Sequence, residues 1–326
     1  MTRLAVLFLG LLIDRLIGDP DWVWRRVSHP VVVFGAMIGF ADRQLNDPVE
    51  TGGVRRRRGI VALAAMIAVV VAAGWLLSDL FGLLGWAGVL LEAVLVSVFL
   101  AQKSLFDHVR AVADGLRQGG LEGGRRAVSL IVGRDPEALD RPAICRAAIE
   151  SLAENFSDGV VAPALWYLIG GLPGLLAYKL VNTADSMIGH LNAKYRDFGW
   201  ASARFDDVMN WPAARLSAFV FALAAWWTGG RAAGRTAIGA ALRDADLHRS
   251  PNAGWPEAAV AGALGLALGG PRTYGELVVR APCLNGAGTR NATVDTVENA
   301  VQLGTKASDL LLLSVFLVLL VSIFLL

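Results

Sequence analysis

The sequence predicts an all-α, polytopic integral membrane protein, a helical bundle with re-entrant or broken helices and a polar site at its cytoplasmic face. Of the 326 residues, 55% are hydrophobic and only 18% are charged, whereas soluble domains are about 45–50% apolar and about 25% charged. Residues 59–77 form an uncharged run long enough to cross roughly 30 Å of hydrocarbon. Helical patterns dominate, with little strand alternation. A lipid bilayer is therefore the expected environment.

The clearest apolar segments predict a transmembrane hairpin and a C-terminal span. Residues 59–77 and 80–101 are separated by Ser78-Asp79 and together form the expected hairpin over 59–101, with Glu92 as the one charge inside its second half. Residues 310–326 predict a third span. Weaker candidates, some of them expected to be re-entrant or buried in the bundle, are residues 4–17, 30–41, 159–178, 213–228 and 255–270. No repeat or linker divides the chain, so we expect one membrane domain over residues 1–326, with a motif-rich catalytic region over 140–271.

Charge distribution predicts the orientation of these segments. Arg55 to Arg58 precede the hairpin, and eight Lys or Arg residues follow it between Lys103 and Arg146. Basic loops favour the cytoplasmic side, so we expect residues 140–257 to gather there, with 159–178 and 213–228 dipping into the membrane or packing. The net charge of only +2 and the lack of a basic tract interleaved with aromatic residues argue against nucleic acid as a partner.

The first two polar clusters lie at residues 13–35 and 150–163. In the first cluster, Gly-Asp-Pro interrupts a helix among polar residues. A solvated turn without a function would show the same pattern. In the second, acidic residues recur at a spacing of four, and like charges on one helical face destabilise the helix unless a cation lies between them. Oxygen ligands of this kind suit Mg²⁺ shared with substrate phosphates, although an exposed acidic face would look the same. The residues concerned are Asp14, Asp19 and His29 in the first cluster and Glu150, Glu154, Asn155 and Asp158 in the second.

The third cluster, residues 178–210, combines carboxylates, amides and cations in one stretch. Its members are Lys179, Asn182, Asp185, Ser186, Lys194, Arg204, Asp206, Asp207 and Asn210. An apolar chain does not need so many of these groups for solubility, so we favour a functional site with phosphate-binding cations.

The fourth cluster, residues 246–265, carries His248, Ser250, Asn252 and Glu257 around Pro and Gly breakers. A lone histidine is more often structural than catalytic. No Gly-x4-Gly-Lys-Ser/Thr phosphate loop is present, so ATP would bind without one.

These clusters together resemble the adenosylcobinamide-phosphate synthase family of cobalamin biosynthesis, the CobD/CbiB proteins of the bacterial inner membrane. The resemblance rests on DRLIGDP with HPV, ESLAENFSDGVVAP, YKLVNTADSMIGH, FGWASARFDDVMNWPAARL, and HRSPNAGWPEAAVAGALG followed by LGGP, in this order. It implies ATP-dependent amide ligation of adenosylcobyric acid with (R)-1-amino-2-propanol O-phosphate, or with the free amino alcohol. The corrinoid, the amine, ATP and Mg²⁺ are thus the expected ligands. The oligomeric state stays open between a homo-oligomer and association with other cobalamin-assembly enzymes.

Candidate roles follow from this chemistry. We expect catalytic residues among Glu150, Glu154, Asp158, Asp185 and His248. Metal ligands are expected among Glu154, Asp158, Asp185, Asp206 and Asp207, with Glu150 as a further candidate. Substrate or nucleotide binding is expected from Asp14, His29, Asn155, Lys179, Asn182, Ser186, Lys194, Arg204, Asn252 and Glu257. The base that deprotonates the attacking ammonium is open among His29, His248 and a carboxylate.

Three other functions compete with a ligase. A transporter would also use an intramembrane Glu92 and broken helices. A membrane sensor of the same superfamily would keep the topology without needing the full acidic set. A phospholipid-type phosphotransferase is disfavoured because its Asp-Gly-x-x-Ala-Arg signature is broken here, where Asp158-Gly159 leads to Ala162-Pro163.

Overall fold

A computed structural model of the chain describes residues 2–133, 136–270, 272–274, 277–279 and 281–325. The described residues are mostly helical, which confirms the all-α membrane class. The helical segments among them that are long and apolar enough to cross a membrane are Gly52–Leu83, Trp86–Gln118, Arg141–Ile188, Trp200–Leu247 and Val294–Phe324. The protein is therefore a multi-pass helical membrane protein. Pro271, which ends the predicted catalytic region, and Leu326, which ends the predicted C-terminal span, lie outside the described residues.

Internal contacts divide the chain into two compact units that interleave in sequence. Unit 1 comprises Met1–Leu100, Ala162–Asn210 and Val318–Leu326, and unit 2 comprises Ala101–Val161 and Trp211–Leu317. Each unit is assembled from segments far apart in the chain, so the expectation of one domain stays a prediction.

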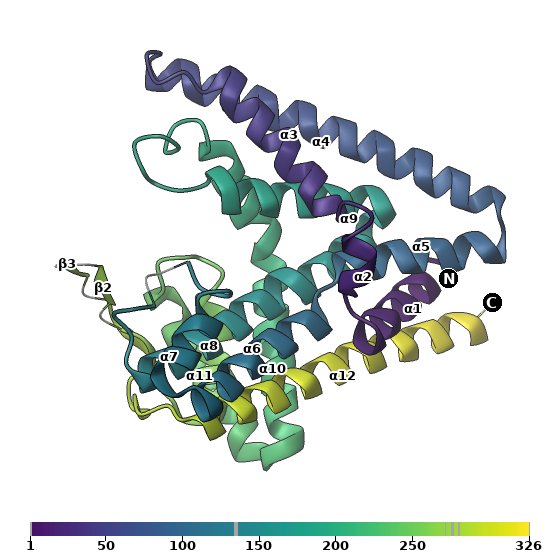
Figure 1. Cartoon of the computed structure of the whole chain (residues 1–326). Helices are drawn as coiled ribbons and strands as arrows, with labels where there is room; N and C mark the ends of the chain where they lie inside the picture. The colour runs from purple at the N-terminus through teal and green to yellow at the C-terminus, as the bar shows by residue number, and fades with distance from the viewer. Residues whose placement is uncertain (1, 134–135, 271, 275–276, 280, 326) are drawn as a thin grey trace. The chain divides into compact units, whose positions relative to one another are not determined.

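Unit 1 is built mainly from long helices. They are α1 (Thr2–Leu16), α2 (Asp21–Trp24), α3 (Pro30–Leu45), α4 (Gly52–Leu83), α5 (Trp86–Phe99), α9 (Ala162–Ile188) and the start of α10 (Trp200–Asp244). α4 packs on α9, and α1 packs on α5 (Figure 1). A Cβ atom on Gly74 of α4 would lie 2.7 Å from the Cα of Pro173, so glycine permits this close approach. α9 is kinked at Gly171, whose φ is 63°, two residues before Pro173, which cannot donate a helical hydrogen bond.

The turn between α4 and α5 lies farther along the chain than predicted. α4 continues through Ser78-Asp79 to Leu83, and Gly85 then reverses the chain with φ 58°. The predicted break at Ser78-Asp79 is wrong, because neither residue ends a helix whose neighbouring residues are helical. The chain turns at Gly85 instead, because the positive φ of the turn favours glycine. Large apolar side chains stay exposed around this turn, as Leu83 and Trp86 show (both 84%), because lipid solvates them.

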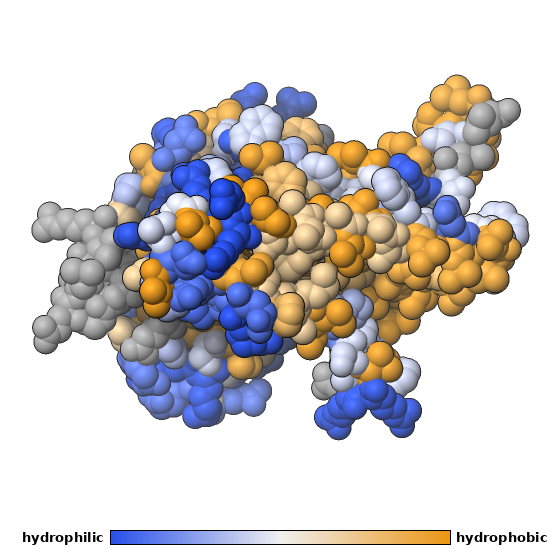
Figure 2. Space-filling model, turned by 90° about the horizontal axis from the view of Figure 1, so that it is seen from above, coloured by the Kyte–Doolittle hydropathy of each residue, from blue (hydrophilic) through white to orange (hydrophobic). Residues whose placement is uncertain are grey.

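Unit 2 combines short helices and turns with the greater part of α10 and α12 (Val294–Phe324). Its elements are α6 (Gln102–Gln118), α7 (Gly120–Val128), α8 (Arg141–Phe156), a π-helical turn (Ser157–Val161), the rest of α10, a 3-10 turn (Ala245–Leu247), α11 (Gly254–Leu264) and most of α12. α8 begins where the sequence indicates, because the Asp140 carboxylate accepts the N–H of Ala143 at 2.8 Å. Hydrophilic and hydrophobic residues gather on different parts of the visible surface in Figure 2, as expected for a bilayer protein.

The segment 255–270 does not form a span. α11 has 11 residues and ends at Gly265, which has φ 67°, so it covers only about 16 Å. It is nearly wholly buried, and the chain continues into β1 (Leu268–Gly269), which pairs with β4 (Cys283–Leu284). β2 (Arg272–Tyr274) pairs with β3 (Leu277–Val279). These strands were not predicted, because two or three residues are too few to show alternation.

Candidate functional site

Polar residues of the third cluster lie on surfaces of α9 and α10 that meet in unit 1. Tyr178, Asn182 and Asp185 recur at spacings of four and three, which puts them on one face of α9. Asp206 and Asn210 share a face of α10 in the same way. We call the group the acidic–amide cluster, and its members are Tyr178, Asn182, Asp185, Asp206, Asp207 and Asn210.

Hydrogen bonds fix the centre of the acidic–amide cluster. The Tyr178 hydroxyl donates to Oδ1 of Asn210 at 2.9 Å, and Nδ2 of Asn210 donates to Oδ2 of Asp206 at 2.9 Å. Nδ2 of Asn182 donates to the other oxygen of Asp206 at 3.2 Å. Tyr178, Asn210 and Asp206 are all buried. Two amides thus hold one buried carboxylate in a fixed orientation.

Further charges surround Asp206. Asp185 and Asp207 lie close enough to interact with it electrostatically, and Asp207 is 3.7 Å from the largely exposed guanidinium of Arg204. The described residues contain no group of three or more His, Cys, Asp or Glu side chains arranged to hold a metal ion. Mg²⁺ is usually bound by only one or two carboxylates together with substrate phosphates and water, so this cluster fits a metal only if phosphate completes its coordination.

His29 lies in a second group in unit 1, with Asp19 and Lys179. Its Nε2 is 3.9 Å from Oδ1 of Asp19, and Lys179 is close enough to act electrostatically on both. Burial lowers the pKa of His29 below its ordinary value, and Asp19 offsets this only in part. Burial likewise raises the pKa of Asp19. Nδ1 of His29 accepts the N–H of Val31 at 3.2 Å and caps α3.

Lys194 belongs to a third group that ties α3 and α4 to the loop before α10. Its ammonium donates to Oδ2 of Asp42 at 2.9 Å and to the hydroxyl of Tyr195 at 2.7 Å. Asn46 donates to Oδ1 of Asp42 at 2.7 Å, and the buried Arg55 donates to Asn46 at 2.8 Å and to the carbonyl of Lys194. Burial raises the pKa of Asp42, but the bonds from Asn46, Lys194 and Tyr195 outweigh it and hold the pKa below its ordinary value. This arrangement gives Lys194 a structural partner.

In unit 2, the second cluster spans the end of α8 and the π-helical turn. Glu150 is 5% exposed, and its Oε1 accepts the N–H of Gly269 at 2.8 Å. Glu154 and Asn155 are exposed, and Asp158 is half-buried on the π-helical turn. Such turns occur often at functional sites. Glu150 thus anchors β1, whereas Glu154 and Asp158 are accessible.

The fourth cluster forms a capped loop before α11. Nδ1 of His248 accepts the N–H of Ser250 at 3.0 Å, and its Nε2 is 3.7 Å from Oε1 of the buried Glu257. The Ser250 hydroxyl accepts the N–H groups of Asn252 and Ala253, both at 3.2 Å. His248 and Glu257 therefore hold the loop onto α11.

Comparison with known proteins identifies the family. A family model described as CobD/Cbib protein matches residues 7–304. The chain belongs to the CobD/CbiB family. Similar relatives are named cobalamin biosynthesis protein CobD: one from Sinorhizobium sp is 61% identical over 300 residues, covering 92% of this chain and 93% of the relative. Another from Rhizobium meliloti is 58% identical and covers 91% of each chain, and one from Rhodobacter capsulatus is 47% identical and covers 88% of each. No solved structure matches the chain.

For this CobD/CbiB family member, the predicted site residues separate into distinct groups. Asn182, Asp185, Asp206 and Asp207 come together, with Arg204 at their edge. Ser186 lies on α9 beside them, but its hydroxyl donates to the Asn182 carbonyl at 3.0 Å in its own helix. Asp14 is buried on α1. Glu150, Glu154, Asn155, Asp158, His248, Asn252 and Glu257 belong to unit 2.

Sequence reasoning missed two arginines in unit 2. The guanidinium of Arg215 lies 4.1 Å from the ring centre of Trp211 and 4.6 Å from that of Trp255, so the two indoles hold it next to the His248 loop. Both tryptophans stand in the quoted motifs, and the signal was present in NWPAARL and AGWPE. Arg290 donates to the Gly269 carbonyl at 3.2 Å and to the Cys283 thiol at 2.9 Å, a role that no motif indicated.

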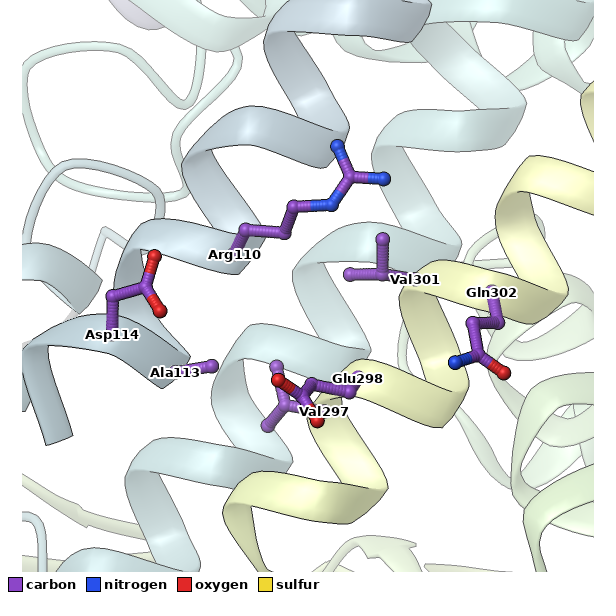
Figure 3. Close-up of a pocket in the computed structure, with 7 residues that line it drawn as sticks. All are labelled: Arg110, Ala113, Asp114, Val297, Glu298, Val301 and Gln302. Carbon is purple, nitrogen blue, oxygen red and sulfur yellow. The ribbon is translucent and has the colours of Figure 1, made fainter. Parts of the chain in front are cut away.

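A pocket of about 340 Å³ lies between α6 and α12 in unit 2. Figure 3 shows Arg110 and Asp114 on α6 and Glu298 and Gln302 on α12, around the apolar Val301. None of the predicted site residues lines it, and Arg117 on α6 forms an ion pair with Glu298. We assign it no part in the site.

Proposed function

We propose that this chain catalyses the amide-forming step of cobalamin biosynthesis in which adenosylcobyric acid is joined to (R)-1-amino-2-propanol O-phosphate, or to the free amino alcohol. The observation that carries the proposal is the match of residues 7–304 to the CobD/CbiB family, with relatives about 60% identical over more than nine-tenths of the chain. The oriented carboxylates of the acidic–amide cluster support it. The expected location is a bacterial inner membrane, with the polar clusters facing the cytoplasm.

The reaction needs an activated acyl group, because a carboxylate and an ammonium do not condense unaided in neutral water. ATP is the proposed co-substrate, and transfer of its terminal phosphoryl group to the corrinoid carboxylate gives an acyl phosphate that the amine attacks, with release of phosphate. Bound Mg²⁺ would offset the negative charge on the transferring phosphoryl group. Asp185 and Asp207 beside the oriented Asp206 are the side chains of unit 1 that would hold it, and Glu154 and Asp158 are the candidates in unit 2.

Cations of the chain are proposed to bind the phosphates. Arg204 is 68% exposed at its side chain and contacts Asp207 only at 3.7 Å, so its planar guanidinium is available for bidentate contact with phosphate. Lys179 would act as a point charge beside Asp19 and His29. Lys194 is a weaker candidate than the sequence suggested, because Asp42 already holds its ammonium.

The hydrogen bonds favour a carboxylate as the base. Nδ1 of His29 and Nδ1 of His248 each accept a backbone N–H group, so the neutral rings carry their proton on Nε2. Neither ring has a free lone pair with which to take a proton from the attacking ammonium. The preferred base is therefore whichever of Asp185, Asp207 and Glu154 does not hold Mg²⁺.

The test is product formation by the purified full-length protein in lipid nanodiscs. Adenosylcobyric acid is supplied with each amine, with and without ATP and Mg²⁺, and cobinamide products are detected by mass. We expect product only with ATP. Absence of product with both amines contradicts the proposed function.

Variants of the same preparation test the site. Asp185→Asn and Glu154→Gln are expected to retain membrane insertion but lose product formation, whereas Asp79→Asn and Glu122→Gln, which alter exposed carboxylates outside the clusters, retain it. Near-normal turnover in both site variants would refute the assignment of these carboxylates.

One observation favours a transporter as the second candidate. Glu92 on α5 accepts a hydrogen bond from the Tyr167 hydroxyl at 2.7 Å and lines a cavity of about 670 Å³ in unit 1, together with Ser78 and Trp86. Carboxylates at membrane depth often mark transport paths. Solute flux into liposomes in the absence of ATP, lost in Glu92→Gln, would favour this function.

A further inference from the structure

α10 reverses direction at Gly229-Gly230 and folds back on itself within unit 2. Gly230 has φ 77° and ψ −175°, which separates a first arm ending at Gly229 from a second arm that runs to Asp244. A Cβ atom on Gly234 would lie 2.8 Å from the Cβ of Trp226 and 3.0 Å from the Ala222 carbonyl oxygen. The two arms therefore pack tightly at Gly234.

Beside this contact lies an open groove of about 310 Å³, here called the α10 groove. Its walls include Phe219, Leu223 and Trp226 on the first arm and Arg231, Arg235 and Ile238 on the second. Phe219 and Trp226 are about half exposed (53% and 51%), so an apolar and aromatic surface is open to the surroundings. The groove thus combines an apolar floor with two arginines.

The two arginines lack counter-ions within the described part of the chain. Arg231 and Arg235 are exposed and four residues apart on one helical face, and the described residues provide no ion pair or hydrogen bond to either guanidinium. Like charges at this spacing repel each other. They also stand at the N-terminal end of the second arm, where the helix dipole favours an anion. An anion bound between them would relieve the repulsion.

The neighbouring residues place the groove at the level of a membrane interface. Trp227, on the same turn, has its ring centre 5.8 Å from Nζ of Lys306 on α12. Lys306 pairs with Asp309 at 3.3 Å, and the uncharged run of α12 begins at the next residue. Tryptophan and lysine gather where a helix enters the hydrocarbon region. The groove therefore lies where lipid headgroups are found.

We propose that the α10 groove binds an anionic membrane phospholipid, with its phosphate between Arg231 and Arg235 and an acyl chain on Phe219, Leu223 and Ile238. The guanidinium fork matches phosphate geometry. The apolar floor distinguishes a lipid from a free phosphate, which would gain nothing from aromatic walls. This site is separate from the proposed ligase reaction and does not depend on it.

The test uses native mass spectrometry of the purified full chain with phosphatidylglycerol and phosphatidylcholine that carry identical acyl chains. The wild type is expected to retain phosphatidylglycerol preferentially. Arg231→Gln with Arg235→Gln should reduce that preference by about 30-fold, because each arginine near an anionic lipid contributes roughly fivefold. Arg231→Lys with Arg235→Lys keeps the charge and should retain most of the preference, which separates loss of charge from loss of folding.

The matched control is Arg57→Gln with Arg126→Gln, which removes two exposed arginines that do not line the groove and should leave the preference unchanged. An unchanged preference in the Arg231/Arg235 glutamine variant overturns the proposal, as does an equal loss in the control. Displacement of phosphatidylglycerol by millimolar glycerol 3-phosphate also overturns it, because the site would then recognise a soluble phosphate. Phe219→Ser is expected to weaken phosphatidylglycerol retention while leaving the melting temperature in lipid-free detergent unchanged.

Discussion

Replacing Asn210 by leucine tests the hydrogen-bonded centre of the acidic–amide cluster. Asn210 is 1% exposed, accepts from the Tyr178 hydroxyl and donates to Asp206, both at 2.9 Å. Leucine is close to asparagine in size but can make neither bond. Asn210→Leu therefore removes the bond that Asn210 accepts from the Tyr178 hydroxyl and one of the two amide donors that hold Asp206.

The expected cost follows from the two groups that lose a partner. A buried polar group left unsatisfied costs about 1–3 kcal/mol, and Tyr178 is fully buried while Asp206 is 8% exposed. The free energy of unfolding should therefore fall by about 2–6 kcal/mol in Asn210→Leu. Adding Tyr178→Phe removes the hydroxyl whose bond to Asn210 is lost and should recover about 1–3 kcal/mol of that loss. Product formation should also fall, because Asp206 loses its fixed orientation.

The assay is a double-mutant cycle on unfolding in detergent, with wild type, each single variant and the double variant. Ser186→Ala is the control, because the described hydrogen bond of the Ser186 hydroxyl goes to the Asn182 carbonyl of its own helix. If Tyr178→Phe and Asn210→Leu destabilise additively, the two residues do not interact and the reasoning is wrong.

Three further outcomes are expected in detergent unfolding. Because the pKa of Asp42 is lowered in the folded protein, the ionised side chain stabilises the fold fully above about pH 4, and this stabilisation is lost as pH falls further. Asp42→Asn should abolish the loss of stability at acid pH that Asp42 causes. A pH profile of stability that is unchanged in Asp42→Asn would contradict this assignment. The pKa of His29 is lower in the folded protein than in the unfolded chain, so on acidification His29 binds its proton at a higher pH in the unfolded chain. Stability should therefore fall as pH drops from about 7 to 5. His29→Asn, which can still cap α3, should remove that pH dependence while retaining most of the stability at pH 8. Glu150→Leu should lower the free energy of unfolding by about 1.5–3 kcal/mol, because it removes the acceptor of the Gly269 N–H group. Glu150→Gln keeps an acceptor oxygen and should lower it less. Equal losses in the two variants would show that this hydrogen bond does not contribute to stability.

The motifs indicated which segments carry chemistry but not what each side chain contacts. Asn182, Asp185, Asp206 and Asp207 lie together, as helical spacing and proximity in sequence both predict, and their roles stay predictions. His29 and Lys194 looked equally suited to substrate binding, yet the backbone N–H of Val31 and the carboxylate of Asp42 occupy them. Glu150 and Glu154 share one periodicity, but one is buried against β1 and the other is exposed. Periodicity gives the face of a helix and leaves its neighbour undetermined.

The sequence by itself determined that the chain is a helical membrane protein, because apolar composition and run length decide where a segment is soluble. It also determined the family, through motifs spread over most of the chain. Only the tertiary structure decided that α4 continues past Ser78-Asp79, that α11 is a short buried helix and that α10 folds back at Gly230. α4 packs against a segment distant in the chain, as the close approach of Gly74 to Pro173 shows, and local propensity is weak enough for such contacts to override it. The reversal of α10 depends on the positive φ of Gly230 and on the packing of its two arms, where Gly234 meets Trp226.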